Sequence, residues 1–312
     1  MALTADSLQK NRKDYRANSL WRLTLRRILR QRSAVVGAII LLVLVLVAIF
    51  APVIAPYDPT FVLIGEEDVK KRSGPCIHLF GCSEDQPQHI LGIDGNVRDE
   101  FSRVIYGTRV SLFVGLSTVS FAIIVGTILG AIAGFIGGWL DNIIMRILDV
   151  LMAFPSLLLA ITIVSILGKG LENALLAIAI VTIPIYARVV RASVLSVKEN
   201  EYVSASRALG AGPLHILWNR VMPNAVSPLI VQGTLGIADA ILSAAALSFL
   251  GLGAQQPTPE WGQMLGSERS QVFTSPHLVF FPGIAIMITV LAFNLLGDGL
   301  RDAIDPRLNQ TD

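Results

Sequence analysis

Residues 33–56 read SAVVGAIILLVLVLVAIFAPVIAP, and this stretch decides the fold. It contains no charged residue and exceeds the roughly 20 apolar residues that a helix needs to cross the hydrocarbon core of a bilayer. A secretory signal peptide would have an apolar core of only about 7–15 residues and would begin nearer the N-terminus. The sequence therefore predicts a retained first transmembrane helix over residues 33–56.

The composition of the whole chain is that of a membrane protein. Of the 312 residues, 53% are hydrophobic and 15% are charged, whereas a soluble domain is typically about 25% charged. A lipid environment removes the need for a charged surface, because the outer face of a membrane bundle must be apolar. The net charge of +2 gives no indication of a nucleic-acid partner.

Further apolar segments follow the first span. Five of them are long enough, or nearly so, to cross the bilayer as helices: residues 110–135, 143–167, 174–186, 226–250 and 278–300. The sequence therefore predicts an all-α membrane protein with six transmembrane helices.

The basic residues predict the orientation of these spans. Nine of the 25 Lys and Arg residues precede the first span, and a six-span topology places most of the others on the same side. Because basic loop residues concentrate in the cytoplasm, we expect both termini there. Residues 1–32 then form a cytoplasmic basic segment, in which residues 22–32 are expected to form an interfacial amphipathic helix that meets anionic lipid.

Residues 57–108 form a long polar loop that the same topology places outside the cytoplasm. The loop contains both cysteines of the chain, Cys76 and Cys82. A zinc site would need more Cys or His residues at regular spacing, and only His78 and His89 are near, so we expect no metal site. On an oxidising side a local disulfide is the expected state, and two free thiols are the alternative.

The inner loop, about residues 191–225, predicts two short helices joined by a tight turn. The first covers about residues 200–209, and Gly210 follows it where a left-handed cap would fall. The second runs from about residue 214, after a proline suited to a first helical turn, and stops at Pro223. Its many apolar side chains favour a knob that docks on a cytoplasmic partner, and a solvated surface hairpin is the alternative.

Asp239 lies inside the predicted fifth span. A carboxylate at a helix centre costs about 2.5–3.5 kcal/mol on insertion, and such residues are usually functional. Three roles are open: Asp239 lines a pathway through the membrane and meets a positively charged group there, pairs with a basic residue of a partner chain, or lies near an interface.

Other polar residues near the spans favour structural roles. Asp141, Arg146 and Asp149 share a stripe of one predicted helix and are interpreted as an ion-pair network. Trp261, in an outer loop, is interpreted as an anchor at the membrane interface.

No catalytic motif is evident in the sequence. The chain lacks the Gly-x-x-x-x-Gly-Lys-Ser/Thr phosphate loop and the His-Glu-x-x-His zinc motif, and its four histidines are scattered. We therefore expect no catalytic residues and no ATP hydrolysis by this chain. Two function classes stay open as alternatives: a membrane-bound enzyme and an ion-coupled secondary transporter. A secondary transporter would commonly show two similar halves, and this sequence shows no such internal similarity.

The inner loop also carries a resemblance to a known family. Residues 204–210 read SASRALG and residues 220–223 read RVMP, which resembles the cytoplasmic loop of ATP-binding-cassette (ABC) importer permeases. Gly210 and Pro223 keep the spacing of that loop, and Ser204 stands where Glu is usual. Further segments resemble the C-type permeases of the dipeptide/oligopeptide/nickel family: residues 89–94, 98–103, 106–112, 247–253, 257–262, 297–302 and 305–307.

The resemblance implies the type I ABC importer permease fold, with a core permease domain over residues 109–312 that contains five of the spans. It implies that the first inner-loop helix is a coupling helix that docks on an ATPase subunit. The coupling residues are then Tyr202, Ser204, Ala205, Ser206, Arg207, Ala208, Leu209, Gly210 and Pro223.

The resemblance also implies a set of partners in a bacterial inner membrane. These are a homologous second permease, two cytoplasmic ATPase subunits and an extracytoplasmic substrate-binding protein. ATP and Mg would bind to the ATPase subunits, so this chain is expected to hold no cofactor. Short peptides are the expected cargo, and nickel, glutathione or another small solute is the alternative.

Overall fold

The computed structural model describes residues 31–304, which form an all-helical bundle and confirm the predicted fold class. Within this range, five helices are long and apolar enough to cross a membrane. They are α3 (Arg32–Ile54), α4 (Glu100–Ile136), α7 (Leu171–Lys198), α11 (Ser227–Phe249) and α13 (His277–Ile304). A sixth span is present only if the bent pair α5–α6 is counted as one.

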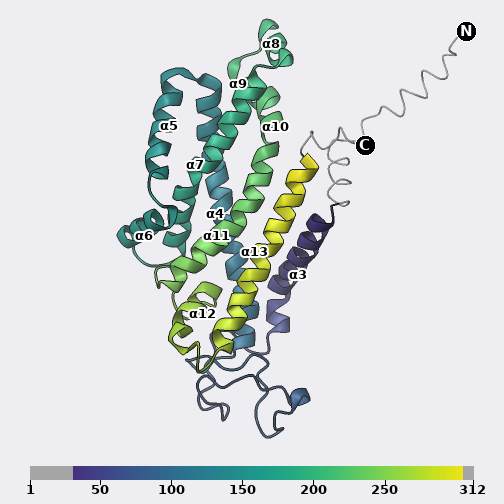
Figure 1. Ribbon diagram of the computed structural model, residues 1–312, viewed down its shortest axis with the longest axis vertical. Helices are drawn as coiled ribbons and strands as arrows, with labels where there is room; N and C mark the ends of the chain where they lie inside the picture. The colour runs from purple at the N-terminus through teal and green to yellow at the C-terminus, as the bar shows by residue number, and fades with distance from the viewer. Residues whose placement is uncertain (1–30, 305–312) are drawn as a thin grey trace, which may run out of the picture.

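The third predicted span, residues 143–167, is wrong as a continuous helix. Its chain forms α5 (Gly138–Met152) and α6 (Ser156–Leu167), which meet at 91°. Pro155 accounts for the break, because proline lacks an N–H, clashes with the preceding turn and disfavours a helical residue before it. Figure 1 shows α5 lying along the bundle and α6 projecting sideways from it.

Two helices extend past the apolar runs that predicted them. The helix α4 begins at Glu100 because the Asp99 side chain caps it, accepting a hydrogen bond of 2.7 Å from the Ser102 N–H. The helix α7 continues to Lys198, well past the predicted end at Tyr186. The first turns of α4 therefore lie within the residues predicted as outer loop, 57–108.

The contact between α4 and α7 forms the centre of the bundle. Gly126, Gly130 and Gly134 recur every four residues on one face of α4, and a Cβ at these positions would press on the α7 backbone near Ala187 and Arg191. Small residues at this spacing allow two helices to approach closely in lipid. This glycine stripe therefore determines which face of α4 meets α7.

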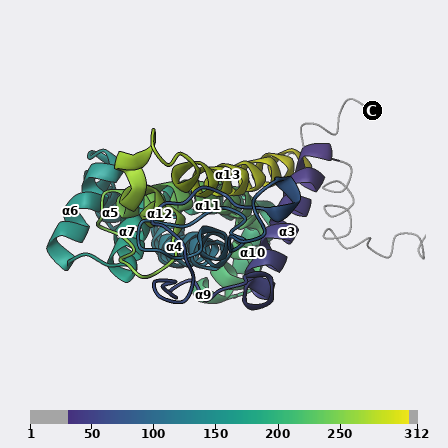
Figure 2. The ribbon, with the colours of Figure 1, turned by 90° about the horizontal axis from the view of Figure 1, so that it is seen from below.

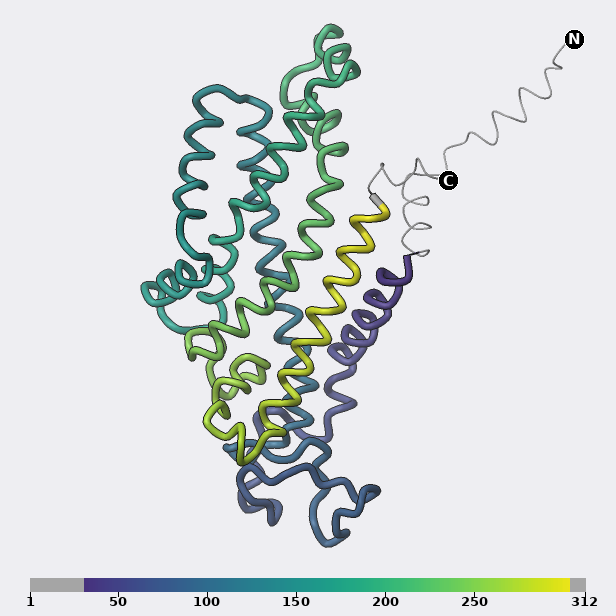
Figure 3. Tube along the Cα trace, viewed as in Figure 1, coloured from purple at the N-terminus to yellow at the C-terminus, as the bar shows by residue number. Residues whose placement is uncertain are grey.

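The remaining helices surround this pair. Figure 2 shows α5 and α6 at one edge of the bundle and α3 at the other, with α4 between them. The helix α3 packs along α13, as the trace in Figure 3 also shows. The first described turn of α3 and the last turns of α13 point to the end of the bundle that carries α8 (Glu201–Ala208), opposite the cysteine-containing loop (Figure 1).

Two expectations concern residues that the structure does not describe. Of the predicted interfacial helix, residues 22–30 lie outside the described range, and Arg32 belongs to α3. The family-like segment at residues 305–307 also lies outside it.

Candidate functional site

The inner loop forms a hairpin of short helices that extends beyond the bundle (Figure 1). After α8, the chain continues through α9 (Pro213–Ile216), a π-helical turn (Leu217–Val221) and α10 (Met222–Ala225). The first predicted helix is thus present, but the predicted stop at Pro223 is wrong. Pro223 lies in the first turn of α10, where a proline is tolerated and does not end the helix.

The hairpin has a buried face and an exposed face. Val203, Ile216 and Val221 are buried and join the main core of the bundle. Four large apolar side chains instead face outward: Tyr202, Leu209, Leu214 and Trp218. The Leu209 side chain is 89% exposed, so the hairpin presents large apolar side chains outside the packed bundle.

Gly210 ends α8 in the left-handed conformation that its position predicts, with φ of +81°. Its N–H donates to the Arg207 carbonyl (3.0 Å), and the Ala211 N–H donates to the Ser206 carbonyl (3.1 Å). A Cβ at position 210 would meet no atom within 4 Å. The left-handed backbone conformation therefore favours glycine at this position, whereas the surrounding space would accept a side chain.

Asp239 lines a cavity of about 300 Å³ between α6, α7 and α11. The polar lining residues come from all three helices: Ser156 on α6, Thr182 and Tyr186 on α7, and Gln232, Asp239 and Ser243 on α11. Gly236 allows the Tyr186 hydroxyl to lie against α11, because a Cβ there would collide with that oxygen. No Lys, Arg or His lines this cavity in the described part of the chain.

Sequence reasoning identified only Asp239 among the cavity residues. The neutral polar residues are scattered singly along apolar helices, so they carry no sequence signal of a shared site. Packing of three helices brings them together.

The acidic residues of α5 form ion pairs with α7. Asp141 accepts two hydrogen bonds of 2.6 Å from Arg191, and Asp149 pairs with Arg188. The predicted partner, Arg146, forms no ion pair among residues 31–304. The sequence predicted ion pairs along a single helix. The pairs instead join α5 to α7, where they link two packed helices.

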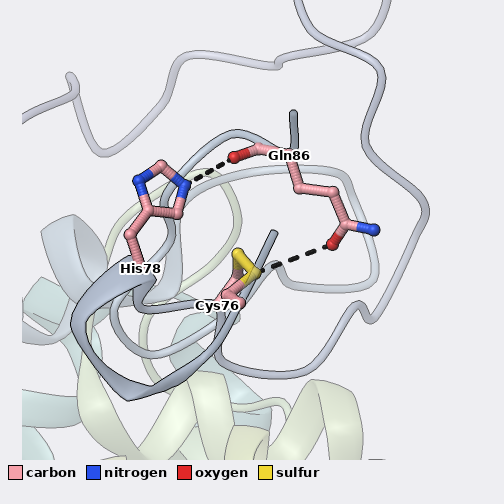
Figure 4. Close-up of a disulfide and its surroundings, with 4 residues drawn as sticks. Cys76, His78 and Gln86 are labelled. Atoms are coloured by element: carbon pink, nitrogen blue, oxygen red, sulfur yellow. Dashed lines mark hydrogen bonds between the residues drawn. A yellow bond between two sulfur atoms is a disulfide. The ribbon is translucent and has the colours of Figure 1, made fainter. Parts of the chain in front are cut away.

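Cys76 and Cys82 form a disulfide, with their Cα atoms 5.4 Å apart. The bridge closes a loop around the 3-10 turn His78–Phe80, and the His78 Nε2 lies 2.8 Å from the Gln86 carbonyl (Figure 4). The Cys76 and His89 backbones exchange two hydrogen bonds of 2.9 and 3.0 Å. Within the described residues, no group of three or more His, Cys, Asp or Glu side chains is placed to hold a metal ion.

His89 is buried between two carboxylates at the base of this loop. Its Nδ1 lies 2.8 Å from Asp99 and its Nε2 lies 3.0 Å from Glu67, while Tyr57 stacks on the ring. Burial lowers the pKa of His89, but the two hydrogen bonds and the carboxylate charges outweigh it and raise the pKa above its ordinary value. Through these two contacts the imidazole ties the loop to the start of α4, and its protonated form can donate from both nitrogens.

Arg103, in the first turns of α4, is a key residue that sequence reasoning did not single out. Only 1% of its surface is exposed. Its Nη1 donates to the Pro59 carbonyl (2.8 Å) and the Pro257 carbonyl (3.1 Å), and its Nε lies 3.5 Å from the Asp94 carboxylate. Arg103 therefore joins the outer loop to the segment between α11 and α12 (Trp261–Glu268).

Trp261 is fully buried, so its predicted role as an interfacial anchor is wrong. Its indole Nε1 donates to the Val104 carbonyl at 3.0 Å. Gly107 leaves room for the ring, because a Cβ there would press on the indole. The tryptophan is a packing residue between α12 and α4.

Two family descriptions match this chain. Residues 126–310 match the family described as binding-protein-dependent transport system inner membrane component. Residues 19–75 match the N-terminal TM domain of oligopeptide transport permease C.

Curated relatives are similar over nearly the whole chain. A dipeptide transport system permease protein of Alkalihalophilus pseudofirmus is 47% identical, over 94% of this chain and 92% of the relative. Its counterpart in Haemophilus influenzae is 46% identical, over 90% and 92%. A glutathione transport system permease protein of Pectobacterium atrosepticum is 44% identical, over 95% and 94%.

Among solved structures, an inward-facing conformation of the MetNI methionine ABC transporter is similar in fold. One of its chains matches with a TM-score of 0.54 at 20% sequence identity, over 65% of this chain and 97% of that chain. At this identity the likeness bears on the fold alone, and it agrees with the type I importer permease fold.

Proposed function

Because this chain belongs to the family of binding-protein-dependent transport system inner membrane components, the permeases of ABC importers, we propose that it forms half of an import pathway for short peptides. The observation that carries this proposal is the 47% identity to a dipeptide permease over 94% of the chain. The 44% identity to a glutathione permease favours glutathione as the second candidate cargo. Both solutes are small peptides.

In this proposal the chain is a non-enzymatic subunit of a bacterial inner membrane complex. A homologous second permease completes the pathway, and two cytoplasmic ATPase subunits bind ATP and Mg. The absence of a phosphate loop from the full sequence supports the assignment of hydrolysis to these partners. An extracytoplasmic binding protein delivers the cargo.

The hairpin end of the bundle faces the cytoplasm in this proposal. Both termini would lie on that side, in agreement with the basic residues that precede α3. The disulfide loop would lie on the opposite, oxidising side, where a bridge between Cys76 and Cys82 is stable.

The coupling residues, Tyr202, residues 204–210 and Pro223, would dock on an ATPase subunit. Two features support this role: the outward apolar group that contains Leu209, and the buried residues such as Val203 that fix the hairpin to the bundle. Because the hairpin is packed firmly against the bundle, it would move together with the transmembrane helices when the ATPase subunits close on ATP. Asp239 would then lie on the pathway that these helices open and close.

Replacing Leu209 by Asp tests the docking surface. We expect the affinity for the ATPase subunits to fall at least about ten-fold, because the interface would have to bury an unpaired carboxylate. The measurement is the amount of ATPase that co-purifies with a tagged permease pair.

Leu79→Asp is the matched control. Leu79 is 87% exposed but lies on the disulfide loop, so its replacement should leave ATPase recovery unchanged. Full recovery of the ATPase subunits with Leu209→Asp, or equal loss with both variants, would contradict docking at α8.

A further inference from the structure

We propose that the cavity lined by Asp239 is a binding subsite for a protonated amine, and that it receives the amino end of the transported peptide. The assignment of the amine to a peptide rests on the proposed function. The subsite itself follows from the chemistry of the cavity.

The cavity holds the Asp239 carboxyl group, and no Lys, Arg or His from residues 31–304 lines it. Asp239 contributes the carboxylate, its other polar lining residues are neutral, and no ion pair of Asp239 is present among residues 31–304. A carboxylate within a span is costly unless a cation or hydrogen-bond donors compensate it. A ligand with a positive charge would supply that compensation.

The ligand class is an amine and not a metal ion. A metal site would need several carboxylate, imidazole or thiolate ligands, and the described cavity wall offers only Asp239. An ammonium group instead has three N–H donors and suits one carboxylate with neutral acceptors beside it.

Thr182 is placed to be one of these acceptors. Its hydroxyl has a single proton, which the Ile178 and Ala179 carbonyls accept as a shared hydrogen bond at 2.9 and 3.0 Å. The oxygen lone pairs therefore remain available to a ligand N–H. The Gln232 amide oxygen offers a further acceptor from α11.

The size and the apolar walls fit the end of a short peptide. A volume of about 300 Å³ lies at the lower limit of ligand pockets, which hold roughly 300–1,000 Å³. Leu157, Val181, Ile185 and Leu242 line the same cavity and would contact the first side chain of the peptide. The site therefore recognises the charge of the amino group and accepts varied apolar side chains.

Direct binding to the complex of both permeases and both ATPases, without the binding protein, tests this subsite. The probes are radiolabelled alanyl-phenylalanine amide and its N-acetylated form, which differ in the charge of the amino group. We expect the free amine to bind wild type at least ten-fold more tightly than the acetylated form. Asp239→Asn should abolish this preference, and Asp239→Glu should retain it.

Asp298→Asn is the matched control, because it removes a carboxylate from α13 outside the cavity, and it should leave the preference intact. Thr182→Val keeps the side-chain shape and should weaken binding of the free amine about three-fold. Equal binding of both probes to wild type, or an unchanged preference in Asp239→Asn, would overturn the proposal. Dissociation of the second permease on Asp239→Asn would overturn it as well, since Asp239 would then pair with that subunit.

The cargo assignment is tested separately by uptake of alanyl-phenylalanine into vesicles that contain the full wild-type importer. An amine preference at Asp239 without peptide uptake would leave the subsite standing and contradict the peptide cargo. Peptide uptake without an amine preference would support the peptide cargo and contradict the subsite at Asp239.

Discussion

Gly210→Val is expected to lower peptide uptake, by up to about ten-fold, while the importer still assembles in the membrane. Gly210 has φ of +81°, and a residue with a Cβ pays about 1–2 kcal/mol in this conformation, with β-branched residues at the upper end. A cost of about 1.4 kcal/mol reduces the population of the native hairpin ten-fold relative to other conformations. The ATPase subunits would then hydrolyse ATP without moving the permease.

Gly210→Asn is the matched control for this prediction. Asparagine tolerates the left-handed conformation, and no atom lies within 4 Å of a Cβ at this position, so uptake should stay near the wild-type rate. Uptake and ATP hydrolysis are both measured in vesicles that contain the whole complex. Normal uptake with valine, or an equal defect with asparagine, would show that the backbone conformation of the cap does not govern coupling.

Arg103→Met is expected to destabilise the outer half of the protein by about 3–5 kcal/mol, because it removes one partner from a buried charge pair. Methionine retains much of the side-chain length, so the loss reflects the charge and its hydrogen bonds more than packing. The substitution leaves the Pro59 and Pro257 carbonyls without their donor and deprives Asp94 of one of its two arginines. The readout is the midpoint of thermal unfolding of the purified complex.

Arg109→Met is the control, since Arg109 lies on the same helix but is exposed. Surface substitutions usually change stability by less than about 0.5 kcal/mol, so this variant should unfold close to the wild-type temperature. Similar unfolding midpoints for the two variants would contradict the prediction that Arg103 stabilises the outer half of the protein.

The sequence predicted those features that arise from local signals. The apolar run over residues 33–56 gives α3 directly, because a helix is the form in which an isolated segment satisfies its backbone within lipid. Gly210 and Pro213 likewise delimit two helices through their own backbone preferences. Such features need no knowledge of what lies nearby in space.

The missed features depend on contacts between distant segments. A single proline does not lower the hydropathy of an apolar window, so hydropathy alone predicts one span across Pro155, where the chain forms two helices. The start of α4 is polar in sequence but buried in the fold, because its residues meet the outer loop and α12. The cavity at Asp239 exists only where three helices pack.

The coupling role of the hairpin and the pathway role of Asp239 remain predictions. The two proposed sites are connected by one helix. The helix α7 contributes Tyr186 to the cavity wall and ends at Lys198, at the base of the hairpin. A shift of α8 would therefore move one wall of the cavity.

Uptake of a labelled dipeptide into vesicles is the measurement that tests this coupling most directly. The two permeases are reconstituted with the binding protein, either with or without the two ATPase subunits, and ATP is supplied on the hairpin side. We expect accumulation only when both ATPase subunits and ATP are present, and none with the permeases alone. Accumulation of the dipeptide by the permeases without any ATPase would show that the hairpin is not the point at which energy enters.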